Sequence, residues 1–288
     1  MKLAIGTAQF GMDYGIANQE GCVSENEVNA ILTYARQNNI LMLDTAIAYG
    51  DSESRLGEIG VSDWQIVTKI GLPVKSKKSV STLVNEQVQA SLLRLNVNNL
   101  YGLLLHNPEC LLNNDGHAVY DALMQLKNNG SVHKIGISIY DTVELEQLCG
   151  RYEFDIVQAP LNVFDRRIVE SHWDKKLQQQ DIELHVRSVF LQGLLLMAAE
   201  KRPERFKQWT SLWSSWDDWT NANGLSFLEA CLRYVFSIKT VDKVIIGIDS
   251  CEQLREIINA IDGELPVLPN ELTCHDVKLL NPSFWGTL

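Results

Sequence analysis

Four ionisable side chains stand at or just after the ends of short apolar stretches of this 288-residue chain: Asp44, Tyr49, Lys69 and His106. A carboxylate, a phenol, an ammonium and an imidazole are groups that enzymes use to move protons and to stabilise charge on a reacting oxygen. An accessible lysine could instead form a Schiff base with a carbonyl compound. Each residue also has a structural interpretation: an ion pair for Asp44 and Lys69, a half-buried aromatic for Tyr49 and a hydrogen-bonded histidine for His106.

Eight short apolar stretches with strand character run through the whole chain: 2–7, 40–44, 64–69, 100–106, 134–138, 154–158, 182–188 and 243–247. Apolar residues at helical spacing fill the segments between them, and Ser24 with Glu27 three residues later is a capping-box signal for a helix over 24–38. This alternation predicts a parallel sheet covered by helices. Eight such units predict an α/β fold, a closed (β/α)8 barrel. An open doubly wound sheet is the alternative, but no Gly-x-Gly-x-x-Gly follows the first strand.

The barrel explains how the four ionisable residues could act together. In (β/α)8 barrels the catalytic residues lie at the carboxyl ends of several different strands. Asp44, Lys69 and His106 end the second, third and fourth predicted strands, and Tyr49 lies in the loop after the second. The fold therefore predicts that all four lie on one rim. Taken singly, each residue favours the structural interpretation, whereas their joint order on one rim favours a catalytic role.

We expect one domain over 1–288, with an insertion around 203–223 and a tail over 263–288, because no linker or change in composition marks a boundary. Loops at the carboxyl ends of barrel strands carry function, so both segments are expected to border the mouth of the barrel. Tryptophans in the insertion follow helical spacing: Trp209, Trp213, Trp216 and Trp219. This face packs on a barrel helix or, in the alternative, forms an aromatic wall over the substrate. Phe284 and Trp285 in the tail could likewise pack on the barrel or contact the substrate.

Composition limits the class of protein. The formal net charge of −11 argues against a nucleic-acid-binding protein, since phosphate contacts need a basic surface. No apolar run reaches the length of a membrane-spanning helix, and the first residues lack the features of a signal peptide. The six cysteines are scattered without a Cys-x-x-Cys motif. That pattern favours a reducing, cytoplasmic setting and predicts no metal site.

The order and spacing of the four residues are similar to those of the aldo-keto reductase superfamily, in its bacterial form. The resemblance is carried by Leu43-Asp44-Thr45-Ala46 with Tyr49-Gly50, then by Thr68-Lys69 and Leu105-His106. It extends over nearly the whole chain through Gly6-Thr7, Gly136, Ser138, Gln158 and Gly193-Leu194-Leu195. The resemblance implies a nicotinamide-dependent oxidoreductase that reduces a small aldehyde or ketone to an alcohol, with sugar-type carbonyls among the candidate substrates.

The resemblance also implies a role for each of the four residues. Tyr49 would donate the proton to the carbonyl oxygen, a step that the Lys69 ammonium eases because it favours the phenolate. Asp44 would pair with Lys69 and limit the cost of burying its charge. His106 would donate a hydrogen bond to the same oxygen, so that no metal is needed there.

The resemblance further implies these contact residues for the dinucleotide: Gly6, Thr7, Ser138, Gln158, Arg187, Ser188, Phe190, Gly193, Gly247, Asp249 and Gln253. Ser138 and Gln158 would meet the carboxamide of the nicotinamide, although Ile139 stands where the family usually has Asn. Arg187 stands where a Tyr commonly stacks on the nicotinamide, and a planar guanidinium can also stack on a ring. Ser188 and the stretch 190–194 would line the pyrophosphate.

The cofactor that the family implies is NADPH, but the residues after the last strand also favour NADH or dual use. The start of a helix over 251–261 suits a phosphate, and NADPH-dependent members usually place Lys or Arg there against the 2′-phosphate. This chain offers Asp249, Gln253 and a more distant Arg255. Asp249 would repel a 2′-phosphate and accept from a ribose hydroxyl, or it is simply a turn residue before the helix.

Two other functions remain open. A barrel that binds the dinucleotide with little turnover could act as a redox-sensing regulatory or interaction module. A Schiff base on Lys69 would instead make the barrel an isomerase or lyase that needs no nicotinamide. The sequence also leaves the oligomeric state and the individual substrate open.

Overall fold

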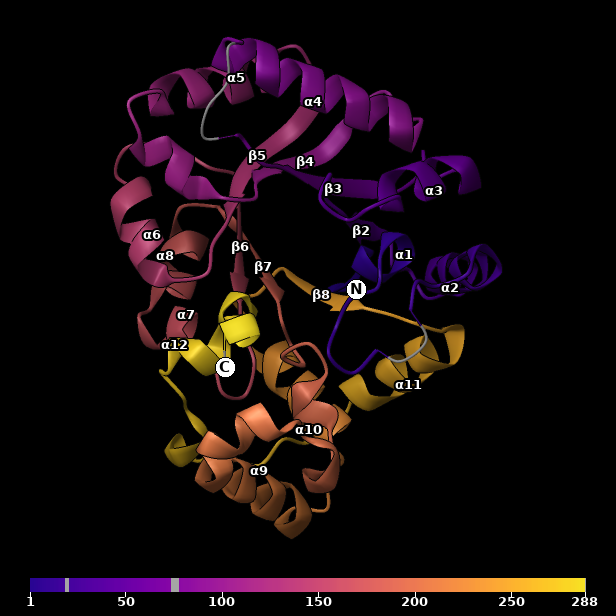
Figure 1. Ribbon diagram of the computed structural model, residues 1–288, viewed down its shortest axis with the longest axis vertical. Helices are drawn as coiled ribbons and strands as arrows, with labels where there is room; N and C mark the ends of the chain where they lie inside the picture. The colour runs from indigo at the N-terminus through magenta and orange to yellow at the C-terminus, as the bar shows by residue number, and fades with distance from the viewer. Residues whose placement is uncertain (19–20, 74–77, 288) are drawn as a thin grey trace.

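The computed structural model describes residues 1–18, 21–73 and 78–287, and Leu288, the last residue of the predicted tail, lies outside them. Eight parallel strands close into a barrel in sequence order, with β8 beside β1 (Figure 1). They are β1 Leu3–Gly6, β2 Met42–Asp44, β3 Gln65–Ile70, β4 Leu100–Leu105, β5 Val132–Ser138, β6 Ile156–Pro160, β7 Glu183–Arg187 and β8 Lys243–Gly247. Each predicted strand overlaps an observed one, so the (β/α)8 barrel is confirmed.

Helices follow the strands and cover the outside of the barrel (Figure 1). They are α1 Ala8–Gly11, α2 Glu25–Gln37, α3 Ser52–Ile59, α4 Val80–Leu95, α5 Gly116–Asn128, α6 Thr142–Leu148, α7 Arg167–Glu170, α8 Trp173–Gln179, α9 Thr210–Ala222, α10 Phe227–Ser237, α11 Cys251–Ile261 and α12 Val277–Leu280. Side-chain caps fix several starts: Ser24 accepts from the backbone N–H of Glu27 at α2, and Ser79 accepts from that of Thr82 at α4.

The inside of the barrel has an apolar layer with a polar layer towards the carboxyl ends of the strands. The apolar layer consists of Ala4, Met42, Val67, Leu104, Ile156 and Ile245. The polar layer contains Asp44, Lys69, Ser138 and Gln158, all nearly inaccessible to solvent. Burying each large apolar side chain stabilises the fold by about 1.5–3 kcal/mol. The packed layer therefore forms a firm base for the polar one.

The insertion forms α9, which lies beyond α10 at the bottom of Figure 1. Trp213 and Trp216 are buried, and the Trp216 ring stacks on those of Trp219 and Phe227 with centroids 5.9 and 5.6 Å away. Trp216 Nε1 donates to Leu195 O (3.2 Å) and so joins the insertion to the segment after β7. The core-packing interpretation of the tryptophans is confirmed, and the aromatic wall over the substrate is wrong.

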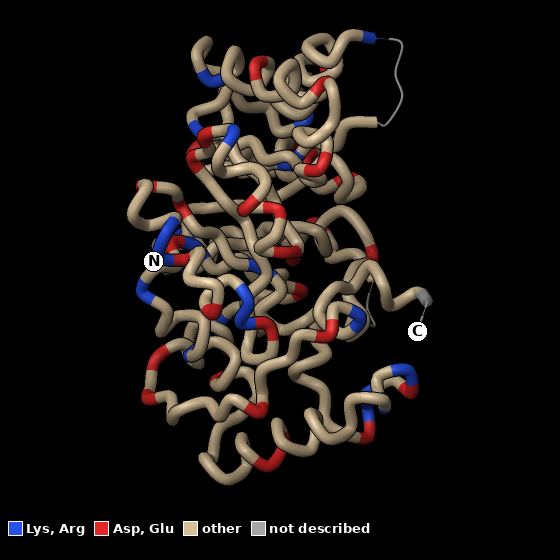
Figure 2. The backbone as a smooth tube through the Cα atoms, turned by 90° about the vertical axis from the view of Figure 1, so that its left-hand side faces the viewer, with Lys and Arg blue, Asp and Glu red and all other residues tan. Residues whose placement is uncertain are grey.

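Charged residues of both signs are interspersed along the chain (Figure 2). Several pair across neighbouring elements, such as Arg94 with Glu53 (2.6 Å) between α4 and α3. Arg202 likewise pairs with Asp217 of α9 (2.5 Å), which ties the segment before the insertion to its helix.

Among the helices that the structure describes, none has the length and apolar composition to cross a membrane.

A polar cluster lies at the amino-terminal end of the barrel. Glu183, the first residue of β7, accepts from Tyr101 Oη (2.7 Å) and Lys134 Nζ (2.5 Å) through one carboxylate oxygen. His185 Nε2 lies 3.0 Å from the other oxygen. Burial alone would raise the pKa of Glu183, but hydrogen bonds with His185, Lys134 and Tyr101 hold that pKa at about 2. The cluster thus stabilises the barrel through a charged carboxylate.

Glu183→Gln is expected to lower the free energy of unfolding by about 2 kcal/mol at pH 7, because the Lys134 ammonium loses its carboxylate partner. The folded-state pKa of Glu183 lies below the ordinary 4.5, so its contribution is present above that pH and fades as the pH falls towards 2. Urea denaturation at pH 7, 5 and 3 should show a difference between wild type and variant that shrinks with acidity. The exposed Glu256→Gln is the control, and a difference independent of pH would contradict the assignment.

Candidate active site

A buried ion pair joins the neighbouring strands β2 and β3. Lys69 Nζ donates to Asp44 Oδ1 (2.5 Å) and to Thr45 O (3.0 Å). The Lys69 side chain is 1% exposed, and burial alone would favour its neutral form. Burial is the largest single influence and would lower the pKa of Lys69, but the Asp44 carboxylate and Tyr49 together raise that pKa, so the pair stays charged.

Tyr49 is held beside this pair by a tight turn after β2. Its backbone N–H donates to Ala46 O (3.0 Å), and Gly50 follows with a φ of 54°. A side chain at Gly50 would collide with Gly11 O, so the turn packs there only with glycine. The Lys69 ammonium lies 5.1 Å from the centroid of the Tyr49 ring. The ammonium therefore lies beside the ring of the phenol.

His106 comes one residue after β4, and its ring meets that of Tyr49 edge-on, with centroids 6.1 Å apart at 89°. Its backbone N–H donates to Ile70 O (2.8 Å), which extends the β3–β4 pairing by one residue. Burial, then the charges of Lys69 and Arg187, lower the pKa of His106 to about 4. The imidazole is therefore neutral at pH 7 and has one N–H to donate to an oxygen near Tyr49.

A run of buried hydrogen bonds extends from the ion pair across the barrel. Gln158 on β6 donates through Nε2 to Asp44 Oδ2 (2.7 Å). It accepts through Oε1 from Ser138 Oγ (3.2 Å) on the neighbouring β5. Ser138 and Gln158, the residues predicted to meet a carboxamide, are thus connected to Lys69 through Asp44.

Arg187 ends β7 next to Ser188, whose φ is 60°. Its guanidinium lies over the ring of Tyr140, 4.4 Å from the centroid. Arg187 also donates to Ile139 O (2.9 Å) and Ser188 Oγ (3.2 Å). The stack occupies one face of the guanidinium, and the two hydrogen bonds fix its plane.

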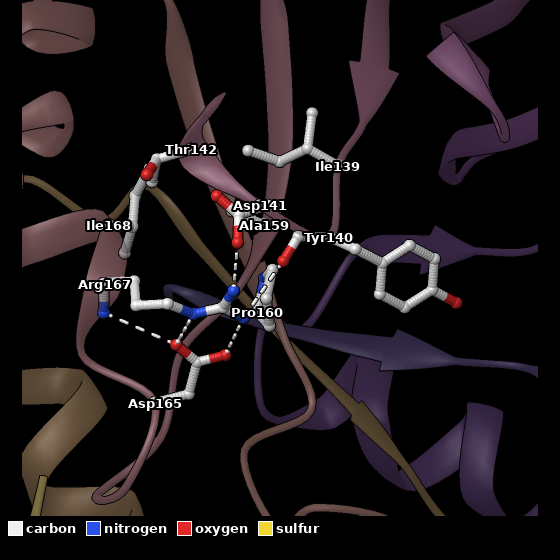
Figure 3. A pocket seen from close by; sticks show the side chains of 9 residues that line it. All are labelled: Ile139, Tyr140, Asp141, Thr142, Ala159, Pro160, Asp165, Arg167 and Ile168. Atoms are coloured by element: carbon white, nitrogen blue, oxygen red, sulfur yellow. Dashed lines mark hydrogen bonds and ion pairs between the residues drawn. The ribbon is translucent and has the colours of Figure 1, made fainter. Parts of the chain in front are cut away.

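A second arginine fixes the loop that carries Tyr140. Arg167 pairs with Asp141 (2.5 Å) and Asp165 (2.8 Å) and donates to Tyr140 O (3.0 Å). Figure 3 shows these contacts, with the Tyr140 ring pointing away from the charged cluster. The segments after β5 and β6 are thereby tied together, and the Tyr140 ring is held against Arg187.

A cavity of about 930 Å³ opens at the carboxyl ends of the strands. Asp44, Tyr49 and His106 are part of its wall, whereas Lys69 is not. Every predicted contact residue of the dinucleotide lines it: Gly6, Thr7, Ser138, Gln158, Arg187, Ser188, Phe190, Gly193, Gly247, Asp249 and Gln253. The structure therefore brings the predicted residues together at one cavity, with the Lys69 ammonium buried behind Asp44 and Tyr49.

Several side chains of the wall escape prediction from the sequence: Gln9, Tyr14, Tyr140 and Lys201. They lie after β1, β5 and β7, in segments whose conformation hydrophobic periodicity does not define. Gln192 Nε2 donates to Tyr14 Oη (3.3 Å), so the segments after β1 and β7 meet beside the cavity. Their place in the segments that follow the carboxyl ends of strands is the one signal that could have identified them.

The insertion and the tail lie mostly away from the cavity. Pro203, at the start of the insertion, lines it, and no tail residue that the structure describes does so. The Trp285 ring instead packs 4.9 Å from Phe206, and its Nε1 donates to Leu279 O (3.0 Å). The expectation that the tail borders the mouth is therefore wrong, because burial of its aromatic residue holds it on the insertion.

The start of α11 already has acceptors for its backbone N–H groups. Cys251 N–H donates to Glu27 Oε1 (2.6 Å), and Gln253 N–H donates to Ser250 Oγ (3.1 Å). The Glu27 side chain, which the sequence assigns to a capping box on α2, reaches α11 instead. Asp249 N–H donates to Gln253 Oε1 (2.7 Å). A phosphate at this helix start would thus meet the carboxylates of Glu27 and Asp249.

Taken together, the arrangement can deliver one proton to an oxygen and hold that oxygen with a neutral imidazole. The volume of the cavity lies near the upper end of the range for ligand sites, which suits a long, partly polar ligand. Within the described ranges, no three His, Cys, Asp or Glu side chains are grouped so that they could hold a metal ion.

Comparisons with known proteins agree with this geometry. The model of the Aldo/keto reductase family matches residues 2–268. The uncharacterized oxidoreductase YqkF of Bacillus subtilis (strain 168) is 27% identical over 284 residues, 90% of each chain. The holo form of the aldo-keto reductase AKR11C1 from Bacillus halodurans has a TM-score of 0.71 at 21% identity, over 92% of this chain and 88% of its own. A putative aldo-keto reductase from Pseudomonas aeruginosa gives 0.67 at 22% identity, over 90% and 89%.

Proposed function

The chain belongs to the aldo/keto reductase family, and we propose that it reduces the carbonyl group of a small aldehyde or ketone, sugar-type carbonyls included, with a nicotinamide dinucleotide bound in the cavity. Membership of this family makes the chain a carbonyl-reducing oxidoreductase. The observation that supports the finer proposal is the contact of Tyr49 and His106 at the cavity, beside the buried pair of Asp44 and Lys69.

Tyr49 is the proposed proton donor. When bound, the reduced nicotinamide supplies a hydride to the carbonyl carbon. As the carbonyl becomes an alcohol, Tyr49 gives its hydroxyl proton to the oxygen, and the nearby Lys69 ammonium stabilises the phenolate that forms. Neutral His106 donates its N–H to the same oxygen, and Asp44 keeps the Lys69 charge in place.

The wall of the cavity fits the dinucleotide. Gln158 Nε2 has a second hydrogen and Oε1 a second lone pair beyond their bonds to Asp44 and Ser138, which suits a carboxamide. The remaining face of Arg187 suits the nicotinamide ring. Other proposed contacts belong to the strand ends and the segment after β7: Gly6, Thr7, Ser188, Phe190, Gly193 and Gly247.

The alternatives have less support. A Schiff base on Lys69 would need the amine to reach a carbonyl compound, but this side chain is 1% exposed and does not line the cavity. A redox-sensing module with little turnover would not need Tyr49 and His106 at the cavity together with the buried pair of Asp44 and Lys69. The six cysteines are free thiols, which supports the cytoplasm as the proposed setting.

The test is an activity screen. The protein is incubated with NADH or NADPH and a panel of aldehydes, ketones and keto-sugars, and the absorbance of the reduced nicotinamide is followed. Binding is checked first by quenching of tryptophan fluorescence. Oxidation of the dinucleotide that depends on one class of carbonyl compound is expected. Absence of dinucleotide binding at millimolar concentration would remove the proposal.

The family makes NADPH the first candidate, whereas the residues at the start of α11 support NADH. Glu27→Gln keeps an oxygen for the Cys251 N–H but removes a charge, and Asp249→Ser removes a second one. The double variant is expected to bind NADPH about tenfold more tightly relative to NADH, because two repulsive carboxylates are gone. Both dissociation constants are measured by fluorescence titration, with Glu256→Gln as control. An unchanged ratio would show that neither carboxylate discriminates between the dinucleotides.

A further inference from the structure

The reacting end of the cavity carries an excess of positive charge within an acidic protein. Lys69 and Asp44 neutralise one another as a buried pair. Arg187 adds a second cation, and among the described residues no carboxylate lies within ion-pair distance of it; its polar contacts are Ile139 O and Ser188 Oγ. Two cations, Lys69 and Arg187, therefore act on His106, and one carboxylate, Asp44, offsets them.

Arg187 is fixed rather than free to turn away. One face of its guanidinium rests on Tyr140 at 4.4 Å, and Arg167 in turn holds the backbone of Tyr140. The two acids that pair with Arg167 belong to the cluster from which the Tyr140 ring points away (Figure 3). The charge of Arg187 is thus presented to the cavity.

His106 lies in the field of these two cations. After burial, Lys69 and Arg187 are the causes that lower the pKa of His106 to about 4, so a second positive charge is disfavoured at that place. Any ring that exchanges a hydride with a carbonyl held by Tyr49 must lie in the same end of the cavity, and Arg187 lines that end.

We propose that Arg187 makes the cavity hold the reduced dinucleotide more tightly than the oxidised one. The inference rests on the proposed function. A dihydronicotinamide ring is neutral; when its C–H bond breaks and the hydride passes to the carbonyl carbon, the ring becomes a cation. The guanidinium repels that cation and favours its release. The same charge attracts the electron density that moves onto the carbonyl oxygen, whose proton comes from Tyr49. The protein therefore works as a reductase that its oxidised cofactor inhibits weakly.

The test compares the dissociation constants of reduced and oxidised dinucleotides, NADH with NAD⁺ and NADPH with NADP⁺, by fluorescence titration or calorimetry at one salt concentration. In wild type the oxidised form should bind at least about tenfold more weakly. Arg187→Met should reduce this ratio by at least about tenfold, because the charge is lost while an apolar contact remains. Arg187→Lys should keep the ratio within about threefold. Arg151→Met, which removes an exposed arginine, should leave it unchanged.

The ratio separates this role from others. If Arg187→Met weakens both forms equally, the arginine serves the phosphates or the fold, and the proposal is overturned. A wild-type ratio near one overturns it as well. If wild type binds neither form, the proposed function itself fails and the inference falls with it. A ratio that falls in the Met variant and persists in the Lys variant supports it even where overall affinity changes.

Discussion

Tyr49→Phe is expected to lower carbonyl turnover by at least about 100-fold, the usual scale for loss of a general acid. The ring stays in place against His106 and near the Lys69 ammonium, and the hydroxyl that would give its proton to the substrate oxygen is gone. The affinity for the dinucleotide should change less than about twofold, since only one hydroxyl of the wall is lost. Steady-state kinetics with the best substrate of the panel and fluorescence titration measure the two quantities.

Tyr140→Phe is the matched control, because it removes a hydroxyl from the same cavity and keeps the ring that supports Arg187. Its turnover should stay within a few-fold of wild type. Comparable losses in the two variants would mean that Tyr49 acts through cavity packing. Full turnover in Tyr49→Phe would exclude it as the proton donor.

Lys69→Met is expected to have the second largest effect, on both stability and turnover. Met fills much of the volume of Lys, but Asp44 is left as a buried carboxylate without its cation, which costs about 3–5 kcal/mol of unfolding free energy. Turnover should fall at least about 100-fold, since the phenolate of Tyr49 loses the charge that stabilises it. Urea denaturation and steady-state kinetics give the two readouts.

The double variant Asp44→Asn with Lys69→Met separates the two effects. Without either charge, much of the lost stability should return, because a neutral amide is far cheaper to bury than a lone carboxylate. Turnover should remain low, because no ammonium faces the phenol. Recovery of turnover together with stability would show that the ion pair is structural only.

The barrel and its rim follow from the sequence because both depend on local patterns. Apolar stretches of strand length alternate with helical spacing, and closure brings the ends of β2, β3 and β4 to one place. Asp44, Lys69 and His106 were predictable as neighbours for this reason. The place of Tyr49 on the same rim was predictable from its spacing in the sequence, five residues after Asp44.

The remaining features depend on contacts that no local pattern contains. Glu27 and Cys251 lie 224 positions apart, and the capping signal at Glu27 would be the same without their bond. The helical spacing of the tryptophans predicts that they share one face of a helix. It does not predict whether that face packs on the core or contacts a ligand. The stack of Arg187 on Tyr140 likewise needs two loops of irregular conformation.

Ser138, Gln158, Asp44 and Lys69 occupy four strands yet act as one hydrogen-bonded unit. The amide of Gln158 has a single workable orientation, since turning it over would set its oxygen against the Asp44 carboxylate. A substitution at any member disturbs the partners of the next, so energetic effects along the unit should be strongly non-additive. During evolution, a substitution at one of these positions would then require a matching substitution at its partner. Gln158 and Asp44 should therefore covary among relatives, although they are 114 residues apart in the sequence.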